Sequence, residues 1–501
     1  MATLKEYRDI RIDKLNKLKE LGVNPYPAKS NRTNQNIEVI ENFSELENKE
    51  VTIVGRIISI RSHNVLCFID IKDASGKIQL YLKQDNFKEQ DYKKGEIKFE
   101  DINLLDTGDF VEGTGKVTKT KTGQISVEIE KLRLLSKSLR PLPDQHTGFK
   151  DKESRLRKRY IDTNINENVY QRFIRRAKFW EAHREFFKEK GFLEMNIPVL
   201  ENIPGGADAN PFVTHMDALD QDFYLRISQE LYLKRLIGGG YEKVYEIGPR
   251  FRNEGLSDEH LPEHIAMEFY WAYANHEEGM KFVIELFRYV ANKVYGTQQF
   301  KIRGFDVDLS KEWEIVDYSD LIKKTYNIDV FNTNLEEITK ALKDSGAELP
   351  KKLTVERGID HLWKEARKKI AGPMMIVNEP KMLSPLAKEN PENPKLTLRF
   401  HPIIAGSELG NGFSELNDPI DQFERFKEQQ EKRDSGDAEA QFMDADFVEM
   451  LEYGMPPTCG YGHSERVFWF LEDVTAREGV PFTQLRHEVD EINKEIYGLE
   501  G

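Results

Sequence analysis

The chain has 501 residues, of which 39% are hydrophobic and 32% are charged, and its formal net charge is −14. This composition is typical of a folded protein of two or three domains and excludes a disordered chain. The acidic balance argues against indiscriminate coating of nucleic acid, although a local basic face can still bind RNA. Because the sequence has no run of about 18 apolar residues, we expect no transmembrane helix and no membrane partner.

The cysteines and the first residues of the chain bear on the compartment. Cys67 and Cys459 lie in different regions and form no metal-ligand cluster, and the first residues lack the basic start and apolar block of a secretory signal. Cysteine use of this kind favours a reducing environment. We therefore expect a cytoplasmic protein.

The first third of the chain predicts a helix followed by a barrel. Residues 4–22 have apolar positions at helical spacing, and Gly22 and Pro25 should end the helix. Residues 51–135 contain five short β-rich runs separated by Gly, Asp and Asn turns. This spacing favours a small β-barrel, with an OB-fold as the best candidate and an unrelated small β-domain as the alternative.

The rest of the chain predicts a second domain of another class. A Pro-containing hinge covers residues 139–144, and from about residue 165 helices and strands mix without regular alternation. This pattern predicts an α+β domain on an antiparallel sheet. Residues 276–372 are interpreted as a helical insertion without recognisable chemistry, and residues 487–499 as a terminal helix. We expect domains at 1–145 and 146–501.

The most informative stretch is Ile247–Glu254, which contains Phe251-Arg252-Asn253-Glu254. An Arg and a Glu two apart on a strand project to the same face. The Arg is a permanent cation suited to a phosphate or carboxylate, and the Glu accepts from an amino group. The pattern F-R-x-E resembles the second signature motif of class II aminoacyl-tRNA synthetases.

Other segments extend this resemblance along the chain. The order of barrel, hinge and mixed domain is similar to the lysine, aspartate and asparagine subgroup, and within it the chain resembles the lysyl-tRNA synthetases. The segments that carry this are GVNPYP (22–27), LRPLPD (139–144), IPGGADANPFVTH (203–215), SPLAK (384–388) and GNGFSELND (410–418). The resemblance implies a class II catalytic domain, an N-terminal anticodon-binding OB-fold, and a homodimer that uses the first motif, GFLEMNIPVL (191–200).

The resemblance also implies the reaction and the nucleotide site. ATP and lysine would form lysyl-adenylate, and the lysyl group would pass to lysine tRNA, with Arg252 at the α-phosphate and the lysine carboxylate. Glu254 would accept from adenine, and Arg466 would stack on adenine from a third motif, GYGHSER (460–466), that is one residue shorter than usual. Further matched positions are His260 and His264 for ATP and Glu408 for Mg²⁺.

The lysine pocket implied by the resemblance needs acids at two separated points, because an unpaired buried ammonium costs several kcal/mol. Glu230 and the backbone of Gly206 would take the α-ammonium. The side-chain ammonium would be surrounded by Glu268, Tyr270 and Glu415. Asn411 would assist Arg252, and Phe413 would line the aliphatic stem.

Three positions depart from the family pattern. His264 stands where an aromatic that stacks on adenine is usual, and its flat imidazole could still stack. His401 stands where the family has a second acid seven residues before Glu408. Imidazole is a poor ligand for Mg²⁺, so we expect fewer or differently held metal ions. Glu259 stands where an Arg is usual, so one contact to the γ-phosphate is expected to be lost or supplied elsewhere.

In the predicted barrel, Phe68 and Gln79 match residues that stack on and hydrogen-bond the middle anticodon base. A core aromatic of the barrel is the alternative for Phe68. Arg61 could contact phosphate, and the basic side chains of the first helix could add diffuse attraction: Lys5, Arg8, Arg11, Lys14 and Lys17.

Other functions remain open at this point. An aspartate- or asparagine-specific relative would need a cation or an amide reader in its pocket, whereas the acids here favour a cationic side chain. An enzyme that lysylates a protein is a second alternative, although relatives of that kind lack the barrel. A non-catalytic RNA-binding relative is a third, and the presence of Arg252, Glu254 and Arg466 argues against it.

Overall fold

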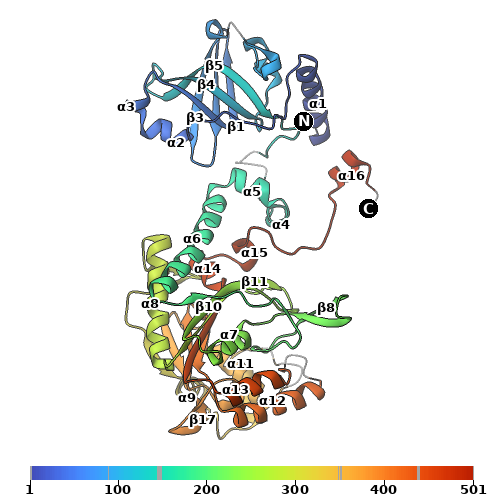
Figure 1. The fold of residues 1–501 in the computed structure, drawn as a ribbon. Helices are drawn as coiled ribbons and strands as arrows, with labels where there is room; N and C mark the ends of the chain where they lie inside the picture. The colour runs from blue at the N-terminus through green and yellow to red at the C-terminus, as the bar shows by residue number, and fades with distance from the viewer. Residues whose placement is uncertain are drawn as a thin grey trace. The chain divides into compact units, whose positions relative to one another are not determined.

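The computed structural model describes residues 3–87, 90–143, 149–347, 349, 353–436 and 440–499. The chain forms two compact units, one of Met1–Arg155 with Leu485–Gly501 and one of Leu156–Gln484 (Figure 1). No helix within the described ranges is long and apolar enough to cross a membrane.

The first unit is built around a closed five-stranded barrel with the strand order β1-β2-β3-β5-β4, which confirms the predicted OB-fold. Its interior is filled by alternate aliphatic residues, among them Ile53, Ile69 and Leu80, none of which is exposed. The strands are β1 (Glu50–His63), β2 (Leu66–Lys72), β3 (Lys77–Lys83), β4 (Phe110–Lys119) and β5 (Ile125–Ser136), and the helices are α1 (Leu4–Glu20), α2 (Asn36–Glu41) and α3 (Phe43–Leu46).

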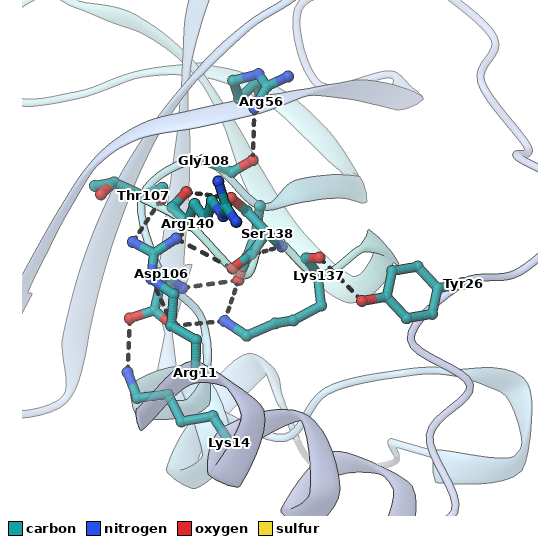
Figure 2. A network of polar contacts seen from close by, with 11 residues as sticks. Arg11, Lys14, Tyr26, Arg56, Asp106, Thr107, Gly108, Lys137, Ser138 and Arg140 are labelled. Carbon is teal, nitrogen blue, oxygen red and sulfur yellow. Dashed lines mark hydrogen bonds and ion pairs between the residues drawn. The ribbon is translucent and has the colours of Figure 1, made fainter. Parts of the chain in front are cut away.

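Helix α1 is fixed to the barrel by charged side chains (Figure 2). Arg11 donates to the carbonyl oxygens of Thr107 at 3.0 Å and Ser138 at 3.1 Å, and the Lys14 ammonium lies 2.7 Å from Asp106. Arg11 and Lys14 thus have partners within the first unit, and their diffuse attraction of RNA stays a prediction.

The C-terminal segment belongs to the first unit, which differs from the expected boundaries. Its helix α16 (Glu491–Tyr497) lies within the stretch expected to be a terminal helix. Lys5 of α1 pairs with Glu495 at 3.0 Å, and Arg140 donates to the Tyr497 hydroxyl at 3.3 Å. These contacts cross most of the sequence, so chain order alone does not reveal them.

The second unit is a mixed α and β structure around a mostly antiparallel sheet, as predicted. The sheet has the order β14-β15-β18-β20-β21-β11-β10-β6, with β19 paired to β18. Among the described strands of this sheet, only the pairs β6–β10 and β14–β15 are parallel. Its strands are β6 (Leu193–Glu194), β10 (Lys243–Phe251), β11 (Glu263–Ala272), β14 (Glu314–Asp317), β15 (Met374–Val377), β18 (Arg399–Ile404), β19 (Ser407–Glu408), β20 (Asn411–Ser414) and β21 (Thr458–Ser464).

Smaller sheets and the helices complete this unit. The remaining strands are β7 (Leu200–Glu201), β8 (Phe212–Met216), β9 (Gln221–Leu225), β12 (Gln299–Ile302), β13 (Phe305–Asp308), β16 (Glu389–Asn390) and β17 (Asn393–Thr397). The helices are α4 (Lys152–Arg157), which spans the unit boundary, α5 (Arg159–Ile165), α6 (Glu167–Glu189), α7 (Glu230–Gly238), α8 (His276–Tyr295), α9 (Tyr318–Tyr326), α10 (Leu335–Asp344), α11 (Val355–Arg367), α12 (Pro419–Asp434), α13 (Ala445–Tyr453), α14 (Arg466–Leu471) and α15 (Ala476–Gly479).

The region expected to be an insertion, residues 276–372, has two parts with different packing. Helix α8 packs on α6 and on the central sheet (Figure 1), and Gly279 permits this, because a Cβ there would lie 2.4 Å from the Cys459 sulfur. Helices α9, α10 and α11 pack in a second core, which includes Ile322, Ile338 and Leu362 and also Ile376 of β15 and Ile403 of β18. Helix α8 is therefore part of the sheet's own core.

Candidate active site

A cavity of about 760 Å³ opens on the central sheet of the second unit. Side chains from α7, β11, β18, β20, β21 and α11 line it. Ten of the residues singled out in the sequence meet there: Gly206, Glu230, Arg252, Glu268, Tyr270, Glu408, Asn411, Phe413, Glu415 and Arg466. Glu254, His260 and His264 are not among its lining residues.

Glu268, on β11, is the most completely hydrogen-bonded acid of the cavity. Its Oε1 accepts from the Ser228 hydroxyl at 2.8 Å and from Arg250 at 3.2 Å, and its Oε2 accepts from the Tyr270 hydroxyl at 3.1 Å. Burial raises the pKa of Tyr270 well above its ordinary value, so the phenol stays protonated and donates. This arrangement fixes a carboxylate in the cavity wall.

Two further acids, Glu230 and Glu415, are buried in the same wall. Burial, together with repulsion from neighbouring carboxylates, raises the pKa of both, and Lys234 opposes the shift. The Lys234 ammonium lies 2.5 Å from Glu230 and forms an ion pair with Glu415. The three acids therefore come from α7, from β11 and from the segment after β20.

Glycines create the space that these acids occupy. Gly206 has φ +84°, and a Cβ there would lie 2.7 Å from the Glu230 Cβ. A Cβ at Gly460 would lie 2.1 Å from Glu415 Oε1, and one at Gly462 would lie 2.8 Å from Glu268 Cγ. In the structure these two glycines of the third motif therefore give room to the acids.

Arg252 lies in the loop beyond β10, and its Nε, although buried, has no hydrogen-bond partner in the described structure. Arg252 and Glu254 were predicted to share one face of a strand. This prediction is wrong, because β10 ends at Phe251. The Arg252 amide still donates to the Pro262 carbonyl at 2.8 Å, but proline has no N–H to return the bond. The chain then leaves the ladder, and Glu254 is exposed.

His260, in the loop after β10, and His264, on β11, have other partners. His264 accepts at Nε2 from Arg250 at 3.1 Å, and its Nδ1 lies 3.2 Å from the Leu261 carbonyl oxygen. Burial and the nearby Arg250 lower the pKa of His264 well below its ordinary value, so the imidazole is neutral. His260 is exposed, and its Nδ1 lies 2.7 Å from the Ser257 hydroxyl.

Arg466, at the start of α14, contacts a carboxylate of the protein itself. Its guanidinium contacts the carboxylate of Glu259 and the hydroxyl of Ser407, and Arg303 contacts the same carboxylate. Burial lowers the pKa of Arg466 to about 10, which still leaves it charged near neutral pH. The acid that replaces the usual Arg of the loop is thus held by the arginine of the third motif.

Glu408 was expected to bind Mg²⁺, and His401 was expected to be a poor ligand beside it. His401 Nε2 lies 2.6 Å from Glu379, and Nδ1 lies 4.0 Å from Glu408. Trp363 donates to Glu408, and this bond, with His401 and Arg367, outweighs burial and lowers the pKa of Glu408. No three His, Cys, Asp or Glu residues of the described chain are grouped to hold a metal. A Mg²⁺ ion bound by Glu408 would therefore have to take most of its ligands from outside the protein.

Several cavity residues are not evident from the sequence. Arg399 donates to Asn411 at 2.8 Å and to the Ser384 hydroxyl at 2.7 Å, and it pairs with Glu379 at 3.1 Å. Helix α11, expected to have no chemistry, contributes a set of lining residues: Glu356, Arg357, Asp360, His361, Trp363 and Lys364. The periodicity of α11 predicts a helix but does not indicate that one face meets a cavity.

The barrel carries the two residues proposed for an anticodon. Phe68 is partly exposed and stacks on Tyr81 with ring centroids 5.0 Å apart. Gln79 lies on the adjacent strand and is almost fully buried; its amide oxygen accepts from Ser126 at 3.1 Å, and its nitrogen is 3.4 Å from Asp70. Phe68 is therefore not a fully buried core residue of the barrel.

Comparison with known families matches both units. Residues 151–485 match the model for class II tRNA synthetases of the D, K and N type, and residues 51–135 match the model for an OB-fold nucleic acid binding domain. Together these two matched regions cover most of the chain.

Three similar proteins share one name, lysine–tRNA ligase. The lysine–tRNA ligase of Fervidobacterium nodosum is 42% identical over 97% of this chain and 95% of its own length. Those of Thermosipho africanus and Moorella thermoacetica are 41% and 43% identical, over 98% and 95% of this chain and 99% and 97% of their own lengths. The chain therefore belongs to the class II tRNA synthetases of the aspartate, lysine and asparagine group.

Proposed function

We propose that the protein is a lysine–tRNA ligase. It activates lysine with ATP to lysyl-adenylate and pyrophosphate, and then transfers the lysyl group to the 3′ end of lysine tRNA. The observation that carries this proposal is the group of three buried acids, Glu230, Glu268 and Glu415, in one cavity with Arg252 and Arg466.

The acids suit an amino acid with two amines. Glu230, beside the backbone of Gly206, would take the α-ammonium, and Glu268, Tyr270 and Glu415 would surround the side-chain ammonium. An aspartate or asparagine side chain would meet carboxylates here, and the repulsion or unmet hydrogen bonds would exclude it. Asn411 would assist at the carboxylate, and Phe413 would line the aliphatic stem.

The arginines suit the reacting phosphate. A lysine carboxylate oxygen attacks the α-phosphorus of ATP, the bond to the β-phosphate breaks, and pyrophosphate leaves. The Arg252 guanidinium, with an unpartnered buried Nε, would bond both the carboxylate and the α-phosphate as charge builds on the phosphorus. In the second step a hydroxyl of the terminal ribose attacks the carbonyl carbon, and AMP leaves with the bonding electrons. Positioning and charge stabilisation suffice for both steps.

The remaining nucleotide contacts belong to the same proposal. Glu254 and His264 would contact adenine, His260 would contact a phosphate, and Arg466 would stack on adenine. Glu254, His260 and His264 do not line the cavity in the structure, so these contacts require the chain around them to move when ATP binds. Glu408 would hold Mg²⁺, which when bound would neutralise part of the phosphate charge.

The barrel would read the tRNA. Phe68 would stack on an unpaired anticodon base, and the Gln79 amide would hydrogen-bond its edge after giving up its long contact to Asp70. We also propose a cytoplasmic homodimer. In the stretch 191–200 the side chains of Leu193 and Leu200 are exposed, which suits a partner surface.

Amino-acid-dependent pyrophosphate exchange, run with each of the twenty amino acids and without tRNA, tests the first step. We expect lysine alone to support rapid exchange. Exchange driven by aspartate or asparagine, or by no amino acid, would contradict the proposal. Lysylation of a lysine-tRNA transcript then tests the second step, because an enzyme that lysylates a protein would activate lysine but leave the transcript uncharged.

A further inference from the structure

Lys234 is a lysine of the protein itself, bound in the wall of the amino-acid site. It lies on α7 four residues after Glu230, so the two side chains share one helix face. Its side chain is fully buried, and its ammonium pairs with Glu230 at 2.5 Å and with Glu415. The surrounding groups are an aromatic cage and two acids, which is the environment expected for a bound ammonium.

Three rings form this cage. The Lys234 nitrogen lies 5.3 Å from the centroid of Phe413, and 5.9 Å from those of Tyr270 and Phe447. Phe413 and Tyr270 also line the cavity, whereas Lys234 does not. Lys234 therefore acts from behind the acids rather than by touching a ligand.

The electrostatic balance explains why an ammonium is needed there. Burial alone would lower the pKa of Lys234, but the ion pairs with Glu230 and Glu415 outweigh burial and raise it. Without Lys234, two buried carboxylates would face each other and also Glu268. One of them would take up a proton, as closely spaced carboxyl groups do. The other titratable or charged groups that act on these two acids are Glu268 and Tyr270 on β11, Arg399 on β18 and Cys459 on β21.

We propose that Lys234 is a positioning residue that sets amino-acid specificity. By bridging Glu230 on α7 and Glu415 after β20, its ammonium fixes the separation of the two acids and favours the ionised form of both. The site then accepts an amino acid whose two amines are spaced as in lysine and discriminates against the shorter ornithine. This inference rests on the proposed function of the cavity.

The test is pyrophosphate exchange by Lys234→Met with lysine, with ornithine and across a range of ATP concentrations. We expect the KM for lysine to rise about 10-fold or more, because each shared acid loses its place or its charge. The KM for ATP should stay within about twofold, and the preference for lysine over ornithine should fall about fivefold or more. A general loss of structure would raise the KM for lysine and the KM for ATP together. That result would overturn the inference.

The pH dependence adds a readout that a merely structural role would not change. Between about pH 6.5 and 8.5 the KM for lysine should vary less in the wild type than in Lys234→Met, because the Lys234 ammonium favours the ionised form of both acids. In Lys234→Met it should fall as pH rises, since the protonated carboxyl then ionises. Parallel profiles for the two proteins would contradict the proposal. The matched control is Lys243→Met, because Lys243 contacts the rings of Phe192 and Trp271 outside the cavity.

A double variant keeps the test decisive if the single variant does not fold. Lys234→Met with Glu415→Gln removes one charge of each sign, so the buried site stays balanced. We expect its KM for lysine to be no higher than that of Glu415→Gln alone. If the two substitutions instead multiply their effects, the two residues act independently and the inference fails. If the wild-type protein does not activate lysine, the proposed function fails. If the wild type activates lysine but the Lys234 variants do not behave as described, only this inference fails.

Discussion

The cavity of the second unit and the outer face of the barrel differ in how deeply their charged and aromatic side chains are buried. In the cavity, Glu230, Glu268 and Glu415 are almost completely buried and are paired with cations or hydroxyl donors. On the barrel, Phe68 is partly exposed beside Tyr81, and Arg61 pairs with Asp70 in contact with solvent. Buried charges interact strongly and exposed ones weakly. The cavity is therefore suited to select by charge, and the barrel by stacking and shape.

The largest effect should come from Arg252→Ala, which tests whether the cavity works through a buried cation. We expect pyrophosphate exchange to fall about 10³-fold, because the guanidinium would stabilise charge that develops only in the transition state. The control is Arg184→Ala, whose exposed pair with Glu194 should matter little. An Arg252 variant within tenfold of the wild type would remove this residue from the reaction.

Glu415→Gln should have the next largest effect and separates lysine from ATP. The KM for lysine is expected to rise about 10- to 100-fold, since a neutral amide replaces a buried carboxylate that would face the side-chain ammonium. The KM for ATP should change by less than about threefold. Glu246→Gln is the control, because Glu246 is buried with Arg226 but does not line the cavity. Equal effects on both substrates would exclude Glu415 from the lysine pocket.

Phe68→Ala tests the barrel side of the comparison. Aromatic stacking on a base is worth about 1–3 kcal/mol, so the KM for tRNA in aminoacylation should rise about 10-fold. Exchange without tRNA should be unchanged. Phe110→Ala removes another exposed barrel aromatic, which stacks with Arg56, and should leave tRNA binding near the wild-type value. Loss of exchange in Phe68→Ala would show that the barrel does not act through the anticodon.

Glu259→Gln should give the smallest effect, and in the opposite direction. Glu259 engages Arg466 and Arg303, so ATP must displace this carboxylate before Arg466 can contact the nucleotide. Removing the charge should lower the KM for ATP by about threefold. The control is Glu263→Gln, an exposed acid bonded to Gln484. A higher KM for ATP would mean that Glu259 itself supports the nucleotide.

Sequence reasoning predicted the local structure of the barrel well, because its five strands alternate between inside and outside positions. It was less successful where packing between distant elements decides. Helix α8 was interpreted as part of an insertion, although Gly279 fits it closely against β21 and it packs on the central sheet. Periodicity indicates that a helix has an apolar face but not which surface this face meets.

The candidate site shows the same difference between local features, which the sequence predicted, and long-range packing, which it did not. Matched motifs predicted ten of the residues that line the cavity, because each motif brings its functional side chain with it. The same motifs did not reveal that β10 ends before Arg252, or that helix α11 lines the cavity. Both depend on where the chain turns in space.

The sequence by itself determined the fold class, the family and the set of charged side chains available for chemistry, because periodicity and motifs are local properties of a chain. Only the tertiary structure decided which charges are buried and which partners they have. Lys234 four residues after Glu230 is an ordinary surface spacing on a helix, and only packing removes both from water beside Glu415. Coulomb interactions depend on distance and on the exclusion of water, and neither can be read from the order of the residues.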